Sequence, residues 1–338
     1  MGFGVKRMLL TGMLSGLITF TGLAGGVMSH HTEPIPLHRQ QVDQTMVKIS
    51  EFNSMGDFES LTIPLKRAGK LILVEVVIDS MQGNLIFDTG AMGLVLNSIY
   101  FRRSQQSGGK VSGGITGKLN SVSKTKVKNM QISDLYYENL ITDITDLGHI
   151  ENARQVKVLG FFGLSLLADF EVVIDLNNNV LELHRTDWSG KRTSQPELTP
   201  VYDLTLPVTS VSEVLFVEAR IGTKKLTFCL DTGAESNVLS SDLPGKILNT
   251  VTVLRRSKLR GAGTQSAEAI YGVMNDFSID DHKIPGMQTI ITNLTAMKTA
   301  YNMYMDGMLG CDFFEQGVFY INLKRNKIGI CLNKNQKK

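Results

Sequence analysis

The chain has 338 residues, of which 42% are hydrophobic and 20% are charged, so it can bury either one large core or two ordinary ones. Its formal net charge is only +3 and its basic residues are scattered, which leaves nucleic acid binding without support. The six histidines show no metal-ligand spacing, and the sequence predicts neither a metal site nor a cofactor.

The N-terminal segment has the pattern of an export signal. Lys6 and Arg7 precede an apolar stretch from Met8 to Met28, and polar sequence follows. A run of about 20 apolar residues can also span a bilayer, so residues 1–28 are predicted to be either a cleaved signal peptide or an uncleaved anchor. Both alternatives place the body outside the cytoplasm, as a secreted, periplasmic or membrane-tethered protein. We expect residues 29–57 to be a spacer or a propeptide.

The first predicted strands lead to an acidic turn. Leu71–Ile78 is rich in β-branched residues, and after a turn that we place at Gln82-Gly83 the next strand runs into Asp88-Thr89-Gly90-Ala91. Short helices are predicted over Ser98–Ser104 and Leu164–Leu167. A hairpin is predicted over Phe170–His184, because polar turn residues separate two apolar runs.

The same series of elements then recurs. Asp231-Thr232-Gly233-Ala234 follows the first acidic turn by 143 residues, and Leu61–Pro64 matches Leu204–Pro207 at the same spacing. Further along, Gly160–Gly163 matches Gly307–Gly310 at a spacing of 147, so four residues were gained between the two blocks. Self-similarity of this length predicts a two-lobed molecule.

The second copy repeats each local signal. Val214–Ile221 is a predicted strand, Gly222-Thr223 is its turn, and Gly317–Leu332 is a predicted hairpin. The segment rich in Ser, Thr, Pro and charge between the copies predicts a linker. The expected division is an N-terminal lobe over residues 58–184, a linker over 185–202 and a C-terminal lobe over 203–334. The predicted fold class is mainly β, with two pseudo-symmetric closed β lobes.

The two acidic turns predict one shared catalytic centre. If Asp88 and Asp231 lie about 3 Å apart, both carboxylates cannot ionise together and they share one proton. The ionised member can then take a proton from a water molecule while the protonated member donates to a carbonyl oxygen. Such a pair would activate water without a metal or a covalent intermediate.

The residues that follow each aspartate suit this arrangement. Gly90 and Gly233 let the backbone approach the carboxylates closely. Thr89 and Thr232 each offer a hydroxyl for hydrogen bonds between the lobes.

The fourth position of each turn is alanine. Ala91 and Ala234 carry no hydroxyl that could stabilise an ionised carboxylate, so we expect a less acidic working range than with Ser or Thr there.

The three cysteines all lie in the second half of the chain. An odd number cannot pair completely, and the sequence leaves a disulfide open. Because Cys229 and Cys311 lie within apolar runs, we favour buried thiols for both.

These motifs resemble those of the aspartic proteases of the retropepsin-like and pepsin-like clan. The matching features are the DTGA turns, a later glycine-rich segment, the triplets Phe161-Phe162-Gly163 and Met308-Leu309-Gly310, and the hairpin after each triplet. The resemblance runs from Leu61 to Cys331 and implies acid-protease-like lobes with an active-site cleft between them. It also implies that each triplet packs beside its DTGA turn, and that flap hairpins have their tips near Gly114, Gly117, Gly261 and Gly263.

The function that this resemblance implies is aspartic-type endopeptidase activity on a polypeptide substrate, with Asp88 and Asp231 as the catalytic residues. A single chain carries both halves, so we expect a monomer to suffice for activity. The alternative is a catalytically silent exported protein that binds extended peptide between the lobes.

Overall fold

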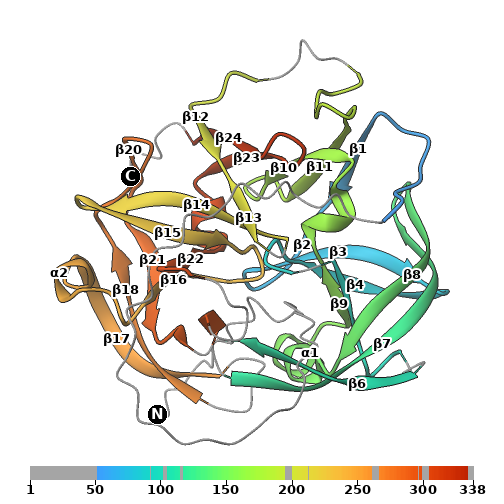
Figure 1. Cartoon of the computed structure of the whole chain (residues 1–338), viewed down its shortest axis with the longest axis horizontal. Coiled ribbons are helices and arrows are strands. Elements are labelled where there is room, and N and C mark those ends of the chain that lie inside the picture. Colours follow the sequence, from blue (N-terminus) through green and yellow to red (C-terminus); the bar gives the residue numbers. More distant parts are fainter. Residues whose placement is uncertain are drawn as a thin grey trace, which may run out of the picture.

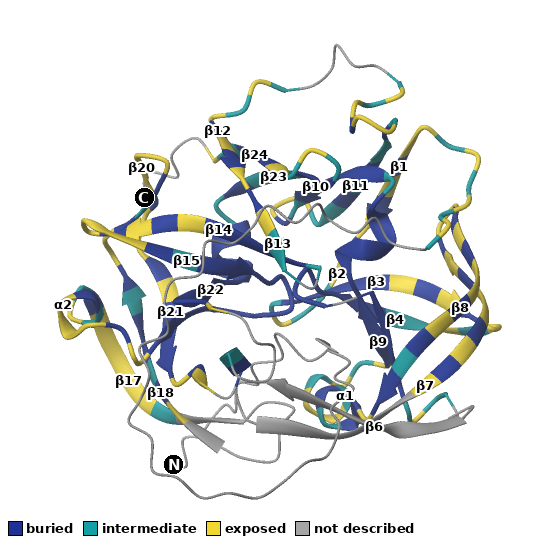
Figure 2. Cartoon of the chain, in the orientation of Figure 1, coloured by how far each residue is buried: buried dark blue, intermediate teal, exposed yellow. Residues whose placement is uncertain are grey.

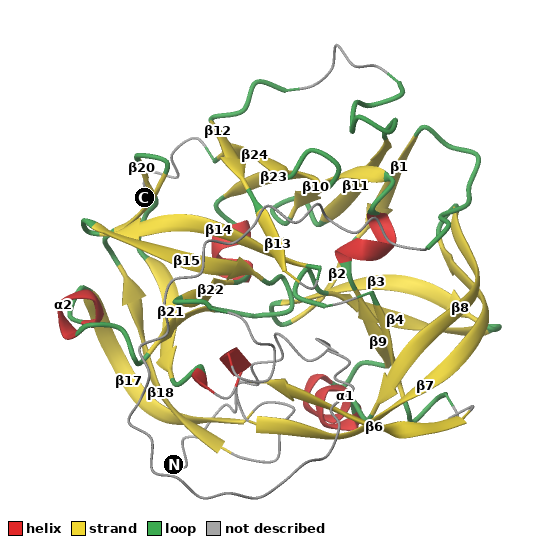
Figure 3. Ribbon diagram, in the orientation of Figure 1, coloured by secondary structure: helices red, strands yellow, loops and turns green. Residues whose placement is uncertain are grey.

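The computed structural model describes residues 52–91, 93–101, 105–114, 117–194, 200–211, 213–260, 266–295, 297–298 and 304–333. The described chain is mainly β-structure and forms two lobes with the same strand order and a shared sheet between them (Figure 1, Figure 3). The fold class predicted from the sequence is confirmed.

The first lobe is an eight-stranded sheet in the order β2-β3-β4-β9-β5-β8-β7-β6. An additional pairing between β3 and β7 closes it. Its strands are β2 (Lys66–Ala68), β3 (Leu71–Ile78), β4 (Met81–Phe87), β5 (Leu94–Asn97), β6 (Gln105–Gly114), β7 (Gly117–Ile132), β8 (Leu135–Thr145) and β9 (Val158–Phe162).

The second lobe repeats this order as β13-β14-β15-β22-β16-β21-β18-β17. The long β7 of the first lobe corresponds here to β18 and β19, and the contact of β19 with β14 corresponds to that of β7 with β3. The strands are β13 (Thr209–Val211), β14 (Val214–Ile221), β15 (Lys224–Leu230), β16 (Asn237–Ser240), β17 (Val251–Arg260), β18 (Ser266–Met274), β19 (Phe277–Ile279), β20 (His282–Lys283), β21 (Met287–Thr292) and β22 (Gly307–Leu309).

A six-stranded interlobe sheet joins the halves in the order β1-β11-β10-β23-β24-β12. Each half supplies one hairpin and one single strand, and antiparallel pairing of β10 with β23 connects them. Both hairpins predicted from the sequence are therefore confirmed, although their pairing with each other was not predicted. The strands are β1 (Ser60–Pro64), β10 (Phe170–Asp175), β11 (Val180–Arg185), β12 (Leu204–Pro207), β23 (Gly317–Asn322) and β24 (Lys327–Leu332).

Helices are few and short among the described residues. They are α1 (Gly148–Arg154), the 3-10 helix η1 (Leu164–Leu167), α2 (Gly245–Leu248) and α4 (Cys311–Phe314). The prediction over Leu164–Leu167 is confirmed. The prediction over Ser98–Ser104 is wrong for its described part, since Ser98–Phe101 forms turns and a bend. Its counterpart in the second lobe contains α2, within the interval where that lobe gained four residues.

The turn between β3 and β4 lies at Asp79-Ser80 and not at Gln82-Gly83. Ile78 pairs with Met81, which leaves a two-residue loop, and both loop residues have positive φ angles of 46° and 70°. Asp tolerates this conformation, and the Asp79 carboxylate accepts two backbone N–H groups at 2.9 Å. Gln82-Gly83 lies inside β4. The turn predicted at Gly222-Thr223 is confirmed.

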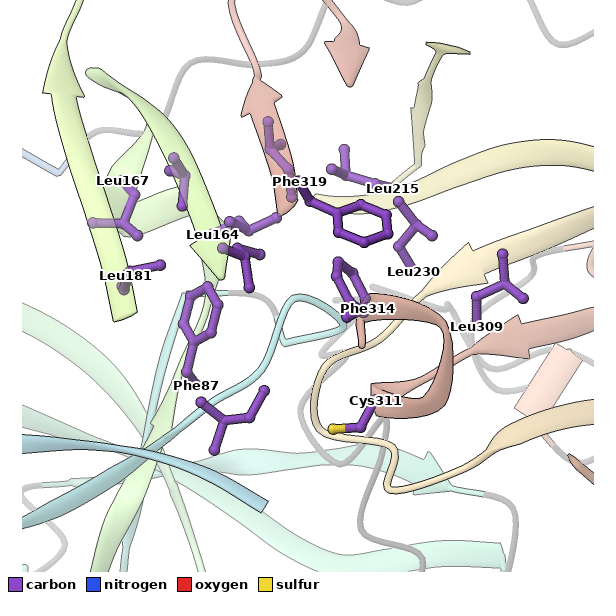
Figure 4. Close-up of a cluster of buried hydrophobic side chains, with 14 of the residues drawn as sticks. Phe87, Leu164, Leu167, Leu181, Leu215, Leu230, Leu309, Cys311, Phe314 and Phe319 are labelled. Atoms are coloured by element: carbon purple, nitrogen blue, oxygen red, sulfur yellow. The ribbon is translucent and has the colours of Figure 1, made fainter. Parts of the chain in front are cut away.

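The largest core cluster draws on both halves of the chain (Figure 2). In Figure 4, Phe87 of the first lobe lies near Phe314 and Phe319 of the second half. Rings of Phe313, Phe314 and Phe319 pack with centroid separations of 4.7–6.1 Å. Because buried aromatic rings contribute large apolar areas, these three rings of the second half form a substantial part of the core cluster that both halves share.

The cysteines of the described structure are all free thiols. Cys229 and Cys311 are buried, as predicted, and Cys331 is partly exposed. The predicted signal or anchor at residues 1–28 lies outside the described residues. Among the residues that are described, no helix is long and apolar enough to cross a membrane.

The close packing of β9 against β5 predicts how a substitution at Gly160 would affect stability. A Cβ on Gly160 would lie 2.0 Å from the Val95 carbonyl oxygen, whereas a Cβ on Gly245 would meet nothing within 4 Å. Gly160→Ala should therefore lower the free energy of unfolding by about 3 kcal/mol, because the backbone must shift, and Gly245→Ala should be neutral or slightly stabilising. Urea denaturation of both variants measures the difference. Equal unfolding midpoints for the two variants would contradict the close contact between Gly160 and Val95.

Candidate active site

Asp88 and Asp231 stand at equivalent places in the two lobes. Asp88 directly follows β4 and Asp231 directly follows β15. The backbone N–H of Asp88 donates to the carbonyl oxygen of Phe162 at 3.0 Å, and that of Asp231 donates to Leu309 at the same distance. Each acidic turn is thereby tied to the apolar triplet of its own lobe.

The triplet glycines fit against the acidic turns without room for a side chain. A Cβ on Gly163 would lie 2.3 Å from the Ala91 carbonyl oxygen, and one on Gly310 would lie 2.5 Å from that of Ala234. The strands β9 and β22 run parallel to the strand that precedes each aspartate and antiparallel to the strand that follows it. The triplets therefore support both turns from behind, as the resemblance implied.

The two turns bring the carboxyl groups of Asp88 and Asp231 together. A Cβ on Gly90 would lie 2.9 Å from the carboxyl carbon of Asp231, and a Cβ on Gly233 would lie 2.6 Å from that of Asp88. Each glycine thus borders the carboxyl group of the other lobe. Any larger residue at either position would push the opposite carboxyl away.

Thr89 and Thr232 form reciprocal hydrogen bonds between the lobes. The N–H of Thr89 donates to Oγ1 of Thr232 at 3.0 Å, and the N–H of Thr232 donates to Oγ1 of Thr89 at 3.0 Å. Each hydroxyl then donates to a carbonyl oxygen of the opposite lobe, Thr89 to Leu230 at 3.0 Å and Thr232 to Phe87 at 2.9 Å. Four buried hydrogen bonds fix one turn against the other.

Backbone N–H groups hold one oxygen of each carboxyl. Oδ1 of Asp88 accepts the N–H of Gly90 at 2.8 Å, and Oδ1 of Asp231 accepts those of Gly233 and Ala234 at 2.9 and 3.1 Å. Both aspartates are completely buried, and Oδ2 of each has no donor among the described residues. A proton shared between the two carboxyls would supply the missing donor.

Burial and mutual repulsion change the acidity of this pair. Burial raises the pKa of Asp88 well above its usual value, and the neighbouring Asp231 raises it further by its charge and by a hydrogen bond. Burial also raises the pKa of Asp231, while the hydrogen bond from Asp88 and the backbone N–H groups oppose that rise. The pair therefore favours a state with one proton, held by Asp88 and directed at an ionised Asp231.

Three ion pairs beside the acidic turns were not predicted from the sequence. Arg154 of α1 pairs with Glu235, and Lys70 pairs with Asp312 of α4. Arg67 pairs with Glu315 at 2.6 Å. In every pair the first half supplies the cation and the second half supplies the carboxylate.

The sequence does contain a trace of this asymmetry. Asp312 follows the second triplet, whereas Ser165 occupies the matching place in the first lobe. Because the two copies differ at this position, the sequence could have indicated that Asp312 makes a contact that Ser165 does not make. Its partner Lys70 could not be identified, because 242 residues separate them.

The flap candidates are only partly placed. In the first lobe β6 and β7 form a hairpin in which Gly114 pairs with Gly117, so these residues stand at its tip. In the second lobe β17 and β18 pair up to Arg260 and Ser266, and the candidates Gly261 and Gly263 lie outside the described residues.

Nothing in the described structure gathers metal ligands. No group of three or more His, Cys, Asp and Glu side chains that could hold a metal ion occurs among the described residues.

Comparison with known proteins finds one family and a set of solved structures. A family model described as aspartyl protease matches residues 217–313, which include Asp231 and the second triplet. No match was found among curated protein sequences. Similar solved structures include basic 7S globulin from soybean, with 11% identity and a TM-score of 0.47, and conglutin gamma from lupine seeds, with 10% identity and a TM-score of 0.48. Each alignment covers 82% of this chain and 96% of the other chain.

The reciprocal threonine contacts predict a large loss on removing one hydroxyl. Thr232→Val keeps the side-chain shape but leaves the N–H of Thr89 and the carbonyl of Phe87 buried without partners. We expect the free energy of unfolding to fall by about 2–4 kcal/mol. Thr232→Ser retains the hydroxyl and serves as the control in the same urea titrations. If the valine and serine variants unfolded at the same urea concentration, the hydrogen bonds would contribute nothing.

The buried pair also predicts how stability depends on pH. The pKa of Asp88 is raised in the folded state above its ordinary value of 3.8, so the folded protein holds a proton that the unfolded chain has lost. This contribution is complete below pH 3.8 and is lost as the pH rises through the folded-state value. Asn at position 88 stays neutral and can still accept the N–H of Gly90.

Asp88→Asn should therefore become progressively more stable than the natural sequence as the pH rises above 3.8. Urea denaturation at a series of pH values measures the difference. A difference that stayed constant from pH 4 to pH 8 would show that Asp88 titrates normally in the folded state.

Proposed function

We propose that this protein is an aspartic endopeptidase, in which Asp88 and Asp231 activate a water molecule to hydrolyse a peptide bond. The observation that carries the proposal is the approach of two buried carboxyl groups from equivalent turns, each bordered by the glycine of the other lobe. The aspartyl protease model matches the second lobe, and the repeated DTGA turn and triplet extend the same features to the first.

Attack on the peptide bond uses both protonation states of the pair. Ionised Asp231 takes a proton from the water, and the water oxygen forms a bond to the carbonyl carbon. Protonated Asp88 gives its proton to the carbonyl oxygen, so the intermediate is a neutral tetrahedral diol. Asp88 is then ionised and Asp231 is protonated.

Collapse of the intermediate restores the starting state. The peptide nitrogen gains a proton from Asp231, the bond between carbon and nitrogen breaks, and Asp88 regains a proton from a diol hydroxyl as the carboxylic acid forms. No bond to the enzyme is made at any stage. The four threonine hydrogen bonds contribute by keeping the two carboxyls at a fixed separation throughout the cycle.

The proposed substrate is a polypeptide in extended conformation. The β6–β7 hairpin, with Gly114 and Gly117 at its tip, would cover the substrate from the first lobe and exclude bulk water. Because one chain supplies both acidic turns, we propose a monomer as the active form. The export pattern of residues 1–28 supports action outside the cytoplasm.

A catalytically silent peptide-binding protein is the second candidate. The observation in its favour is that neither aspartate has any exposed surface in the described structure. Such a protein would hold peptide without cleaving it, and the experiment below separates the two candidates.

Replacement of either aspartate tests the mechanism directly. Asp88→Asn and Asp231→Asn should each lower kcat/KM for a denatured protein substrate by about 10³-fold or more, since a single carboxyl cannot both take and give the proton. Asp281→Asn is the matched control, because Asp281 is exposed and Asn tolerates its positive φ angle. The assay runs from pH 4 to pH 7, with and without a statine-type inhibitor.

The outcomes are distinct. Substantial activity in Asp88→Asn would exclude a shared pair. Binding of a labelled peptide without cleavage by the natural sequence, at any pH tested, would favour the silent candidate.

A further inference from the structure

Two neighbouring cavities open on the interlobe sheet, far in sequence from the acidic turns. Their volumes are about 270 and 220 Å³, and Arg192 and Tyr320 line both. Tyr320 alternates along β23 with Phe319 and Ile321, which belong to the main core. The cavities therefore lie on the face of the sheet that points away from that core (the sheet is at the top of Figure 1). We call the larger one the sheet cavity.

The lining of the sheet cavity is strongly basic. Lys191, Arg192, Arg325 and Lys327 contribute four cations, and Glu171 contributes one carboxylate. Both halves of the chain take part, since Glu171 lies on β10 and Lys327 begins β24. The cavity thus exists only when the two hairpins of the interlobe sheet are paired.

Glu171 neutralises Arg192 and leaves the charges of Lys191, Arg325 and Lys327 uncompensated within the lining. Nε of Arg192 donates to Oε1 at 2.7 Å, and Nδ2 of Asn322 donates to Oε2 at 3.2 Å. Both the Glu171 and Arg192 side chains are more than nine-tenths buried, at 9% and 8% exposure. The buried ion pair of Glu171 and Arg192 therefore forms the bottom of the sheet cavity.

Nη2 of Arg192 carries two N–H groups and lies 2.5 Å from Oε1 of Glu171 as an ion pair. Beyond that carboxylate, this buried nitrogen has no hydrogen-bond acceptor among the described residues. A buried N–H without an acceptor is costly. An anion in the cavity would supply the missing acceptor.

The lysines of the rim are also available. Lys191 and Lys327 are exposed, and neither forms an ion pair with a described acidic side chain. Arg325 is partly committed, since its Nε donates to the Ser189 carbonyl at 3.1 Å. Hydrogen bonds from Ser189 and from the N–H of Lys191 lower the pKa of the exposed Asp187 carboxyl, and the charge of Arg325 adds to this effect. Two lysines thus remain for a ligand, beside the N–H group that the paired Arg192 directs away from Glu171.

The walls add aromatic surface and hydroxyl donors. The rings of Tyr202 and Tyr320 lie 5.1 Å apart between centroids. Burial raises the pKa of Tyr202 to about 12 and also raises that of Tyr320, so both hydroxyls keep their protons at neutral pH. They can donate to an anion and their ring faces can contact a small organic group.

We propose that the sheet cavity binds the phosphate group of a phosphate monoester. A tetrahedral anion with several oxygens matches a bowl that offers a buried guanidinium, two ammonium groups and two phenol hydroxyls from different directions. The same phosphate chemistry is found in a soluble ester and in a phospholipid headgroup. The proposal is independent of proteolysis, because no residue of the cavity belongs to the acidic turns.

Trp188 provides a reporter for binding. It is the only tryptophan of the chain, is 90% exposed and lies two residues before Gly190, which lines the cavity. Titration with inorganic phosphate at constant ionic strength should change its fluorescence in a saturable manner and should raise the unfolding temperature. The absence of both effects, or equal effects with chloride, would overturn the proposal.

Removing the charges of Lys191 and Lys327 tests whether phosphate binds in the sheet cavity. Lys191→Gln with Lys327→Gln should weaken phosphate binding by about tenfold for each lysine removed, and both positions are exposed, so the fold should be kept. Lys246→Gln, on the exposed face of α2, removes the same charge elsewhere and should change nothing. If the double variant bound phosphate as tightly as the natural sequence, the cavity would not be the site.

Binding to lipid vesicles distinguishes a phospholipid headgroup from a soluble phosphate ester as the ligand. Sedimentation with phosphatidylcholine vesicles that contain phosphatidic acid, compared with phosphatidylcholine alone, tests the headgroup. Binding that inorganic phosphate displaces and that the double lysine variant loses would assign the cavity to lipid. Phosphate binding without vesicle binding would assign it to a soluble ester, and vesicle binding that survives in the double variant would exclude the cavity as the lipid site. Asp281→Asn, an exposed substitution outside the cavity lining, should bind phosphate and vesicles as the natural sequence does.

Discussion

The structure depends on the burial of two carboxyl groups against each other. Transfer of even one ionised carboxylate from water into a protein interior is costly, and two at close range also repel. Backbone N–H groups that bind one oxygen of each carboxyl offset part of this cost, and a proton shared between the other two oxygens would offset the rest. The same compensation favours one protonated and one ionised group, which is the state that the proposed acid–base catalysis would require.

The duplicated halves are equivalent at the acidic turns and different around them. Every ion pair beside the turns joins a cation of the first half to a carboxylate of the second. A dimer of identical chains would carry each such pair twice, on both sides of its symmetry axis. A single chain can carry it once, as the change from Ser165 to Asp312 between equivalent positions illustrates. The three ion pairs thus lie on one side of the interface between the halves. Residues at the equivalent positions on the other side can change without breaking them.

Local features of the fold were predictable from the sequence, and contacts between distant segments were not. The strands before each aspartate and the two hairpins follow from alternation and turn residues. The turn at Asp79-Ser80 was missed because composition favoured Gln82-Gly83, although the spacing of the repeat aligns Asp79-Ser80 with the correctly predicted Gly222-Thr223. The ion pairs and the pairing of β10 with β23 depend on how two completed halves meet, and no local pattern encodes that.

That meeting of halves also sets the order in which the site can form. Neither lobe contains a complete site, because the space beside Gly90 is filled by the carboxyl of Asp231 and that beside Gly233 by the carboxyl of Asp88. The hydroxyl of each threonine is likewise satisfied only by the opposite lobe. The pairing of β10 with β23 that joins the lobes spans more than 140 residues and is slow to form by loop closure. An isolated lobe would expose an unpaired threonine and a carboxylate with an ordinary affinity for protons, so the proposed acid–base function would belong to the assembled interface and not to either repeat.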